Sequence, residues 1–253
     1  MDSGDLGPLS QNAFLGGRLS IAQPVNGYRA GIDPVLLAAT VPAKPGQTLL
    51  DLGCGGGVAA LCLGSRVPDV QLYGLEVQSP YAALARQNGD ANGLPIHVFE
   101  GSVEEAPKAL NALSFDHVIA NPPYYSRANG TAAEDEGRDQ GRAGSASLND
   151  WVCLARKRLK PGGTASFVQD AARLPELLAA FQSGFGGITV LPIAPRVGRS
   201  ARLVIVQAQK GSSASFQLLA PLILHEGDKH IKDGDDYCQK TTDILRNAAP
   251  LPL

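Results

Sequence analysis

The sequence lacks any apolar run that approaches the roughly 20 residues of a membrane-spanning helix. Its first residues, MDSGDLGPLS, carry acids where a signal peptide would begin with basic residues. Neither a membrane protein nor an exported one is therefore expected. Four scattered cysteines form no CxxC pair, and we predict that they are free thiols in a reducing cytoplasm: Cys54, Cys62, Cys153 and Cys238.

An excess of charge of one sign is also absent. The chain carries 22 Lys and Arg residues against 24 Asp and Glu residues, which gives a net charge of -2. This balance argues against a general nucleic-acid coat, although a local basic patch is compatible with it. The His, Cys and acidic residues of segment 225–238 match no common zinc spacing, so no metal site is predicted.

The tetrapeptide Asn121-Pro122-Pro123-Tyr124 is the most informative feature that the sequence does contain. It follows the apolar run 115–120, which reads as a buried strand, and two prolines cannot continue a central strand. An amide, a bare carbonyl and an aromatic ring then lie together at a carboxyl strand end, where open α/β sheets bind ligands. Two such oxygens can accept both hydrogens of an –NH₂ group, so the motif predicts a holder of an amine or amide.

A glycine turn marks a second strand end. The segment 47–61 reads as a strand, the turn Asp51-Leu52-Gly53-Cys54-Gly55-Gly56-Gly57 and a helix. Glycines allow a tight turn and a close approach of the backbone to a ligand. The strand 70–76 then ends in Glu76, a position from which a carboxylate can accept two ribose hydroxyls. A purely structural glycine turn remains an alternative at this point.

The rest of the chain continues the alternation of strands and helices. Asp33 is expected to cap a helix that Pro42 and Pro45 end, and the polar segment 126–147 is either a functional loop or disordered. Strands 188–193 and 203–209 have no helical crossover between them and should pair antiparallel. Further helices are expected at 79–92, 104–112, 148–159 and 174–185, and further strands at 95–100 and 164–169.

These elements predict an α/β fold with a doubly wound, mostly parallel seven-stranded sheet that ends in an antiparallel hairpin. The 253 residues, 44% of them hydrophobic, are enough for one large domain with a substantial core, and two small domains also fit this length. We expect an N-terminal extension at 1–46, a core at 47–210 and a tail at 211–253 that packs on the core or trails from it.

The chain resembles the class I S-adenosylmethionine-dependent methyltransferases, a Rossmann-like class. Within them it is similar to the bacterial tRNA adenine-N6-methyltransferases, whose described member modifies the adenine beside the anticodon of a valine tRNA. The likeness covers nearly the whole chain. It rests on Leu15-Gly16-Gly17-Arg18-Leu19, GYRAGIDPVLLAA at 27–39, DLGCGGG at 51–57, Glu76, NPPYY at 121–125, the turn 160–163 and the strand 202–211.

This resemblance implies that S-adenosylmethionine is the cofactor and that the segment 28–33 closes over it. Glu76 would hold the donor ribose. Ser102, where such enzymes usually carry Asp, would bond the donor adenine more weakly, with Val103 beside it. The implied donor-binding residues are Tyr28, Asp33, Asp51, Gly53, Cys54, Gly55, Gly57, Glu76, Val77, Ser102, Val103 and Asn121.

The implied reaction is methyl transfer to the N6 amine of an adenine in RNA, with tRNA as the expected partner. Asn121 and the Pro122 carbonyl would accept the two amine hydrogens, with Pro123 completing the motif, and Tyr124 would stack on the base. Three arginines are candidate RNA contacts: Arg127, Arg196 and Arg199.

The alternatives are a glutamine N5-methyltransferase of the release-factor type, a nicotinamide dehydrogenase, and a non-catalytic RNA- or protein-binding module. The first usually has a separate N-terminal helical domain, for which the short leader leaves no room.

Overall fold

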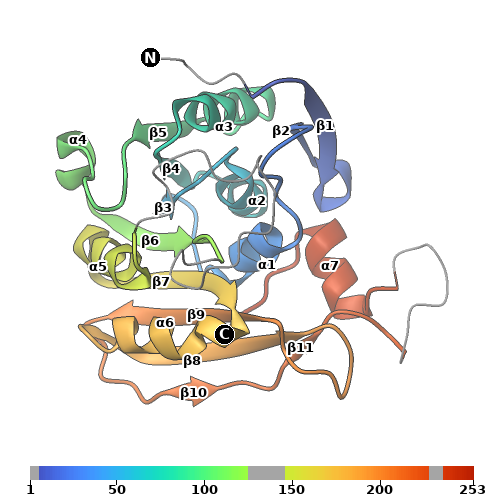
Figure 1. Cartoon of the computed structure of the whole chain (residues 1–253), viewed down its shortest axis with the longest axis vertical. Helices are drawn as coiled ribbons and strands as arrows, with labels where there is room; N and C mark the ends of the chain where they lie inside the picture. Colours follow the sequence, from blue (N-terminus) through green and yellow to red (C-terminus); the bar gives the residue numbers. More distant parts are fainter. Residues whose placement is uncertain (1–5, 125–145, 228–235) are drawn as a thin grey trace, which may run out of the picture.

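The computed structural model of the chain describes residues 6–124, 146–227 and 236–253. Its main sheet contains β3 (Thr48–Leu52), β4 (Gln71–Glu76), β5 (Ile96–Glu100), β6 (Phe115–Ala120), β7 (Leu159–Asp170), β8 (Phe185–Ala194), β9 (Leu203–Lys210), β10 (Gln217–Leu218) and β11 (Leu222–Ile223). The strand order is β10-β8-β9-β7-β6-β3-β4-β5, and β11 also pairs with β8 (Figure 1).

The predicted fold class is confirmed. Strands β5, β4, β3, β6 and β7 are parallel, and β9 runs antiparallel to both β7 and β8. Sequence reasoning missed β10 and β11, two short strands that pair parallel with the outer edge of β8. Each has only two residues, too few to produce a period in the sequence.

Helices cover both faces of the sheet (Figure 1). Alternate residues of a strand point to opposite faces, so Leu49 packs in the core layer with α1 and α2, and Leu50 packs in the layer with α5 and α6. The described helices are α1 (Asp33–Thr40), α2 (Val58–Arg66), α3 (Ser79–Ala91), α4 (Lys108–Asn111), α5 (Leu148–Arg158), α6 (Leu174–Phe181) and α7 (Gln239–Asn247).

The N-terminal segment forms a hairpin that the sequence analysis did not predict. It consists of β1 (Leu9–Phe14) and β2 (Leu19–Pro24). Two asparagines, Asn88 on α3 and Asn92 at the C-cap of that helix, bond the outer edge of β2. The Asn88 amide bonds the N–H and C=O of Ala22 (2.8 and 3.1 Å), and the Asn92 amide bonds those of Ser20 (2.9 Å each). These side chains form hydrogen bonds with backbone groups at the edge of β2 that would otherwise be unpaired.

The C-terminal segment packs against the start of the fold. Helix α7 lies beside the turn after β1, where a Cβ on Gly16 would lie 2.6 Å from the Arg246 carbonyl oxygen. The Leu251 N–H donates to the Ala39 carbonyl at the end of α1 (2.8 Å), and the Leu251 side chain is buried. The tail therefore contributes to the core layer around α1.

Three local predictions need correction. Helix α1 does begin at Asp33, but its N-cap is Ile32, and the Asp33 side chain makes no capping bond. The helix expected at 104–112 is confined to Lys108–Asn111, where Pro107 immediately precedes it. The helix expected at 174–185 ends at Phe181 because Phe185 already begins β8. The segment 125–145, which includes nearly all of the predicted loop, lies outside the described residues.

Candidate active site

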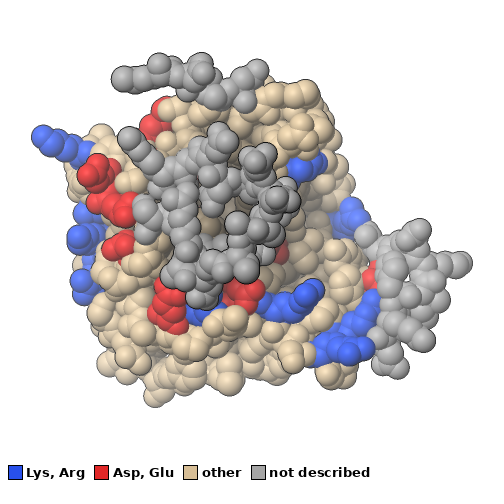
Figure 2. All heavy atoms as spheres, viewed as in Figure 1, with Lys and Arg blue, Asp and Glu red and all other residues tan. Residues whose placement is uncertain are grey.

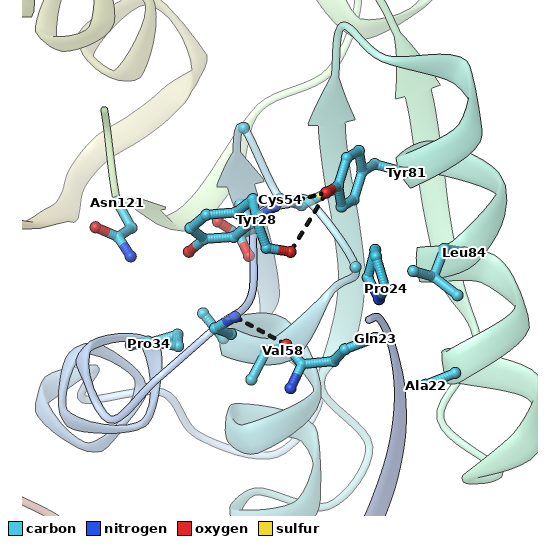
Figure 3. Close-up of a pocket in the computed structure, with 15 residues that line it drawn as sticks. Ala22, Gln23, Pro24, Tyr28, Pro34, Cys54, Val58, Tyr81, Leu84 and Asn121 are labelled. Atoms are coloured by element: carbon cyan, nitrogen blue, oxygen red, sulfur yellow. Dashed lines mark hydrogen bonds between the residues drawn. The ribbon is translucent and has the colours of Figure 1, made fainter. Parts of the chain in front are cut away.

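The predicted motifs meet at one edge of the sheet because parallel strands end there together. In the register, Leu52 pairs with Ala120 on β6 and with Leu75 on β4. Gly53, Asn121 and Glu76 are therefore neighbours. A pocket opens at this edge, lined by Ala22, Gln23, Pro24, Tyr28, Ala30, Pro34, Asp51, Gly53, Cys54, Gly56, Val58, Ala59, Tyr81, Leu84 and Asn121 (Figure 3).

The glycine turn between β3 and α2 forms the floor of this pocket. Gly53, Gly55 and Gly57 all have positive φ, of 65°, 52° and 82°, a conformation that favours glycine. A Cβ on Gly53 would also lie 2.6 Å from the Trp151 ring of α5. The turn is tied to the next strand by N–H bonds from Gly53 and Cys54 to the Leu75 carbonyl (2.7 and 3.1 Å).

Two buried acids flank the turn. Asp51 is 3% exposed, and burial raises its pKa to about 8. Glu76 accepts the N–H of Gly55 and of Gln78 (2.9 Å each), and burial raises its pKa although these bonds oppose the shift. Within the described part of the chain, neither carboxyl forms an ion pair. A cationic ligand would therefore supply the charge partner that this pocket lacks.

Tyr28 lies over the turn from a loop that α3 anchors. The Tyr81 hydroxyl accepts the Tyr28 N–H (3.1 Å) and donates to the Tyr28 carbonyl (3.3 Å). The Tyr28 ring extends from beside Cys54 toward Asn121 (Figure 3). Gln23 holds the other end of this loop by accepting the Ala30 N–H (2.8 Å).

The acceptor motif continues directly from β6. The Asn121 side chain faces the pocket (Figure 3) and forms no hydrogen bond with any other described residue. Gln169 of β7, which is fully buried, donates to the Pro122 carbonyl at 3.5 Å. Arg173 donates to the Pro123 carbonyl (3.1 Å), and the Tyr124 hydroxyl donates to Asp33 Oδ2 (2.7 Å). A carbonyl has two lone pairs, so the Pro122 oxygen can still accept from a ligand.

The remaining predicted donor residues lie around the ends of β4 and β5. Val77 directly follows Glu76, and the Gly101 N–H donates to the Glu76 carbonyl (3.0 Å), which brings Ser102 to the same edge. The Ser102 hydroxyl accepts the Glu105 N–H (3.0 Å). Val103 packs against the core layer of α5 and α6. Cys54 is buried, and none of the four cysteines, all in the described part, forms a disulfide.

The predicted RNA-contacting arginines differ in their surroundings. Arg196 is not a free cation, because it pairs with Asp236 and donates to the carbonyls of Glu226 and Gly227. Arg199 is exposed, and Arg127 lies outside the described residues. The sequence offered Arg196 as a candidate RNA contact because its partner, Asp236, lies 40 positions further along the chain.

Several pocket residues were not predicted from the sequence. Ala22, Gln23 and Pro24 come from β2, and Tyr81 and Leu84 from α3. Asn88 links two of the segments that line the pocket. Its Nδ2 donates to the Ala22 carbonyl on β2 and to the Gly56 carbonyl in the glycine turn (2.9 Å). The available signal was the four-residue spacing of Asn88 and Asn92 at the end of α3, which does not identify a partner.

Comparisons with known proteins agree with this geometry. The methyltransferase small domain family matches residues 30–191. The chain is similar to two enzymes named tRNA1(Val) (adenine(37)-N6)-methyltransferase, from Aeromonas hydrophila (27% identity over 85% of this chain and 89% of that protein) and Yersinia enterocolitica (30% over 76% and 77%). Among solved structures, one titled a predicted O-methyltransferase from Agrobacterium tumefaciens shares 28% identity with a TM-score of 0.70, covering 87% of this chain and 99% of that one.

The pocket fits the donor that this family uses. S-adenosylmethionine is cationic at its sulfonium and ammonium groups. The buried acid Asp51 lines the pocket, and the buried acid Glu76 bonds the glycine turn beside it; neither has an ion-pair partner in the described residues. No helix in the described ranges is long and apolar enough to span a membrane. The chain belongs to the methyltransferase small domain family, and it is a methyltransferase that uses S-adenosylmethionine as its methyl donor.

Proposed function

We propose that this enzyme transfers the methyl group to the exocyclic N6 amine of an adenine in RNA, and specifically in tRNA. The observation that carries the proposal is the position of Asn121: its amide faces the donor pocket, and no described residue occupies its hydrogen-bonding groups. The names of the two tRNA-modifying relatives support RNA as the substrate class. Both oxygens of the holder, on Asn121 and Pro122, lie at the end of one strand.

The proposed chemistry depends on alignment. The lone pair of an adenine amine is delocalised into the ring, so the amine is a poor nucleophile. Asn121 Oδ1 and the Pro122 carbonyl accept its two hydrogens, which favours a pyramidal nitrogen with its lone pair directed into the donor pocket. The bound donor supplies an electrophilic methyl group, and positioning then accounts for most of the acceleration. The base leaves its stack to reach the pocket, as base-modifying enzymes require.

On the donor side, we propose that Asp51, the glycine turn, Glu76, Val77, Ser102 and Val103 bind S-adenosylmethionine beneath Tyr28. Since the Ser102 hydroxyl already accepts the Glu105 N–H, its own hydrogen remains available to a ring nitrogen of the donor adenine. Glu76 has two oxygens at the strand end that suits ribose hydroxyls.

The variant Glu76→Ala tests the donor assignment. We expect its Kd for S-adenosylmethionine to rise about 10- to 100-fold, the effect of losing hydrogen bonds to a charged group. Calorimetric titration measures this directly. Glu100→Ala is the matched control, because Glu100 pairs with Glu76 in the register but is exposed and bonds Arg86. Equal effects of the two substitutions would contradict a specific role for Glu76.

RNA would be recruited by cations spread over the surface of the described residues that Figure 2 shows. On the face shown in Figure 2, the Lys and Arg side chains of the described residues are dispersed, with acids between them. Of the candidate arginines in the described ranges, Arg199 is the exposed one that we propose as an RNA contact, because Arg196 is held by Asp236. Cytoplasmic location stays a prediction.

The deciding experiment is methyl transfer from labelled S-adenosylmethionine to bulk tRNA from a strain that lacks this gene, followed by nucleoside analysis. We expect label in N6-methyladenosine. Label in another nucleoside would overturn the acceptor atom. An enzyme that binds the donor but labels no RNA would overturn the RNA assignment and direct attention to a protein glutamine amide, which the same two oxygens could hold.

A further inference from the structure

The acceptor motif is bonded to the beginning of α1. The Tyr124 hydroxyl donates to Asp33 Oδ2 at 2.7 Å, across 91 positions of the sequence. A hydroxyl that donates to a carboxylate makes one of the stronger hydrogen bonds in proteins. Residues Asn121 to Tyr124 are thus held at their last side chain as well as through β6.

Asp33 has no other role within the described residues that would explain its position. It makes no capping bond for α1 and forms no ion pair with a described cation. The N-terminus of this eight-residue helix favours its negative charge. Asp33 is also absent from the pocket lining, although the next residue, Pro34, is part of it.

The bond fixes an aromatic ring at the point where the proposed acceptor base would arrive. A free tyrosine side chain would have to be ordered when the base binds, whereas a ring already held by its hydroxyl presents its face beforehand. Burial and the adjacent Asp33 both raise the pKa of Tyr124, so its hydroxyl keeps its hydrogen.

We infer that Asp33 is a positioning residue for the acceptor, which holds the Tyr124 ring as a stacking surface for the substrate base and does not bind the methyl donor. This inference rests on the proposed function and revises the role that the family resemblance implies for Asp33. It also means that α1, which follows the Tyr28 loop, connects the donor cover to the acceptor surface.

A double-mutant cycle tests the link, with Tyr124→Phe, Asp33→Ala and the double variant. Tyr124→Phe keeps the aromatic ring and removes only the bond. We expect each single substitution to lower kcat/KM for RNA about tenfold, the lower end of the range for a lost hydrogen bond to a charged group. The double variant should be no worse than either single one, since both remove the same interaction.

Calorimetry on the same proteins separates the two roles of Asp33. We expect the Kd for S-adenosylmethionine to stay within about twofold in Tyr124→Phe and Asp33→Ala, because the link does not touch the donor. Asp33→Asn keeps an acceptor oxygen and should recover part of the activity lost in Asp33→Ala. Tyr73→Phe is a matched control, because it removes a hydroxyl that bonds only Gln71 among the described residues.

The outcomes are distinct. Losses in RNA methylation that add in the double variant, or a weakened donor affinity in Asp33→Ala alone, would overturn the link. If Asp33→Ala does not fold, Tyr124→Phe and Asp33→Asn still decide the question by their kcat/KM values. A wild-type enzyme that methylates no RNA would instead overturn the proposed function.

Discussion

Replacing Asn121 with alanine is expected to lower the rate of methyl transfer about 100- to 1,000-fold, the range found when one preorganised polar group of an active site is removed. Asn121 supplies one of the two oxygens proposed to orient the amine, and its amide faces the pocket without a described partner. The Pro122 carbonyl alone cannot fix both hydrogens. Single-turnover measurements with saturating donor and RNA report this step directly.

Donor affinity and a second substitution complete this test. The Kd for S-adenosylmethionine should change little in Asn121→Ala, because the glycine turn and the two acids are intact. Asn121→Asp retains an acceptor oxygen in the same place and should keep more activity than the alanine variant. If Asn121→Ala lost donor binding along with transfer, the acceptor site would be misplaced.

The second large effect concerns Asn88, which is 1% exposed. Its amide bonds both backbone groups of Ala22 on β2 and the Gly56 carbonyl in the glycine turn. Asn88→Leu leaves these three backbone groups, the two on Ala22 buried and the Gly56 carbonyl partly buried, without partners. We expect this to lower the free energy of unfolding by about 3 kcal/mol. In a chain of this size that corresponds to a decrease in Tm of about 6–12 °C. Donor affinity should fall as well, because the substitution releases two walls of the pocket.

Asn92→Leu is the matched control for Asn88→Leu. Asn92 bonds Ser20 on the same strand but does not touch the glycine turn, and it is less buried. We expect it to cost about 1 kcal/mol of unfolding free energy and to leave the Kd for S-adenosylmethionine nearly unchanged. Thermal unfolding and calorimetric titration of both variants measure the two quantities. Equal losses of donor affinity would show that hairpin docking alone, and not the bond to Gly56, shapes the pocket.

The parts of the site that could be predicted from sequence are those set by strand ends. Asn121, Glu76 and the glycine turn each follow an apolar run, and parallel pairing brings such ends together whatever the intervening residues are. The alternation of strands and helices likewise sufficed for the fold class.

Side-chain bonds between distant segments could not be predicted. Nothing in segment 9–24, which has no clear period, shows that Asn88 and Asn92 will complete its edge, so the hairpin was missed. Asp33 is a residue type that often caps helices. Only the folded chain shows that its carboxylate instead accepts a hydrogen bond from the Tyr124 hydroxyl. In the sequence Arg196 looks like a free cation, but in the folded chain it pairs with Asp236. In each case tertiary structure determines the partner.

The contact between Leu251 and Ala39 has a consequence for the order in which a newly made chain folds. Helix α1 leaves the ribosome before the residue that closes its far end, because Leu251 is made about 210 residues after Ala39. At a synthesis rate of about 5–20 residues per second, this is a delay of roughly 10–40 s. During that interval the helix that carries Asp33 is incompletely covered. Nascent chains should therefore acquire a protease-resistant N-terminal segment only after the tail has emerged.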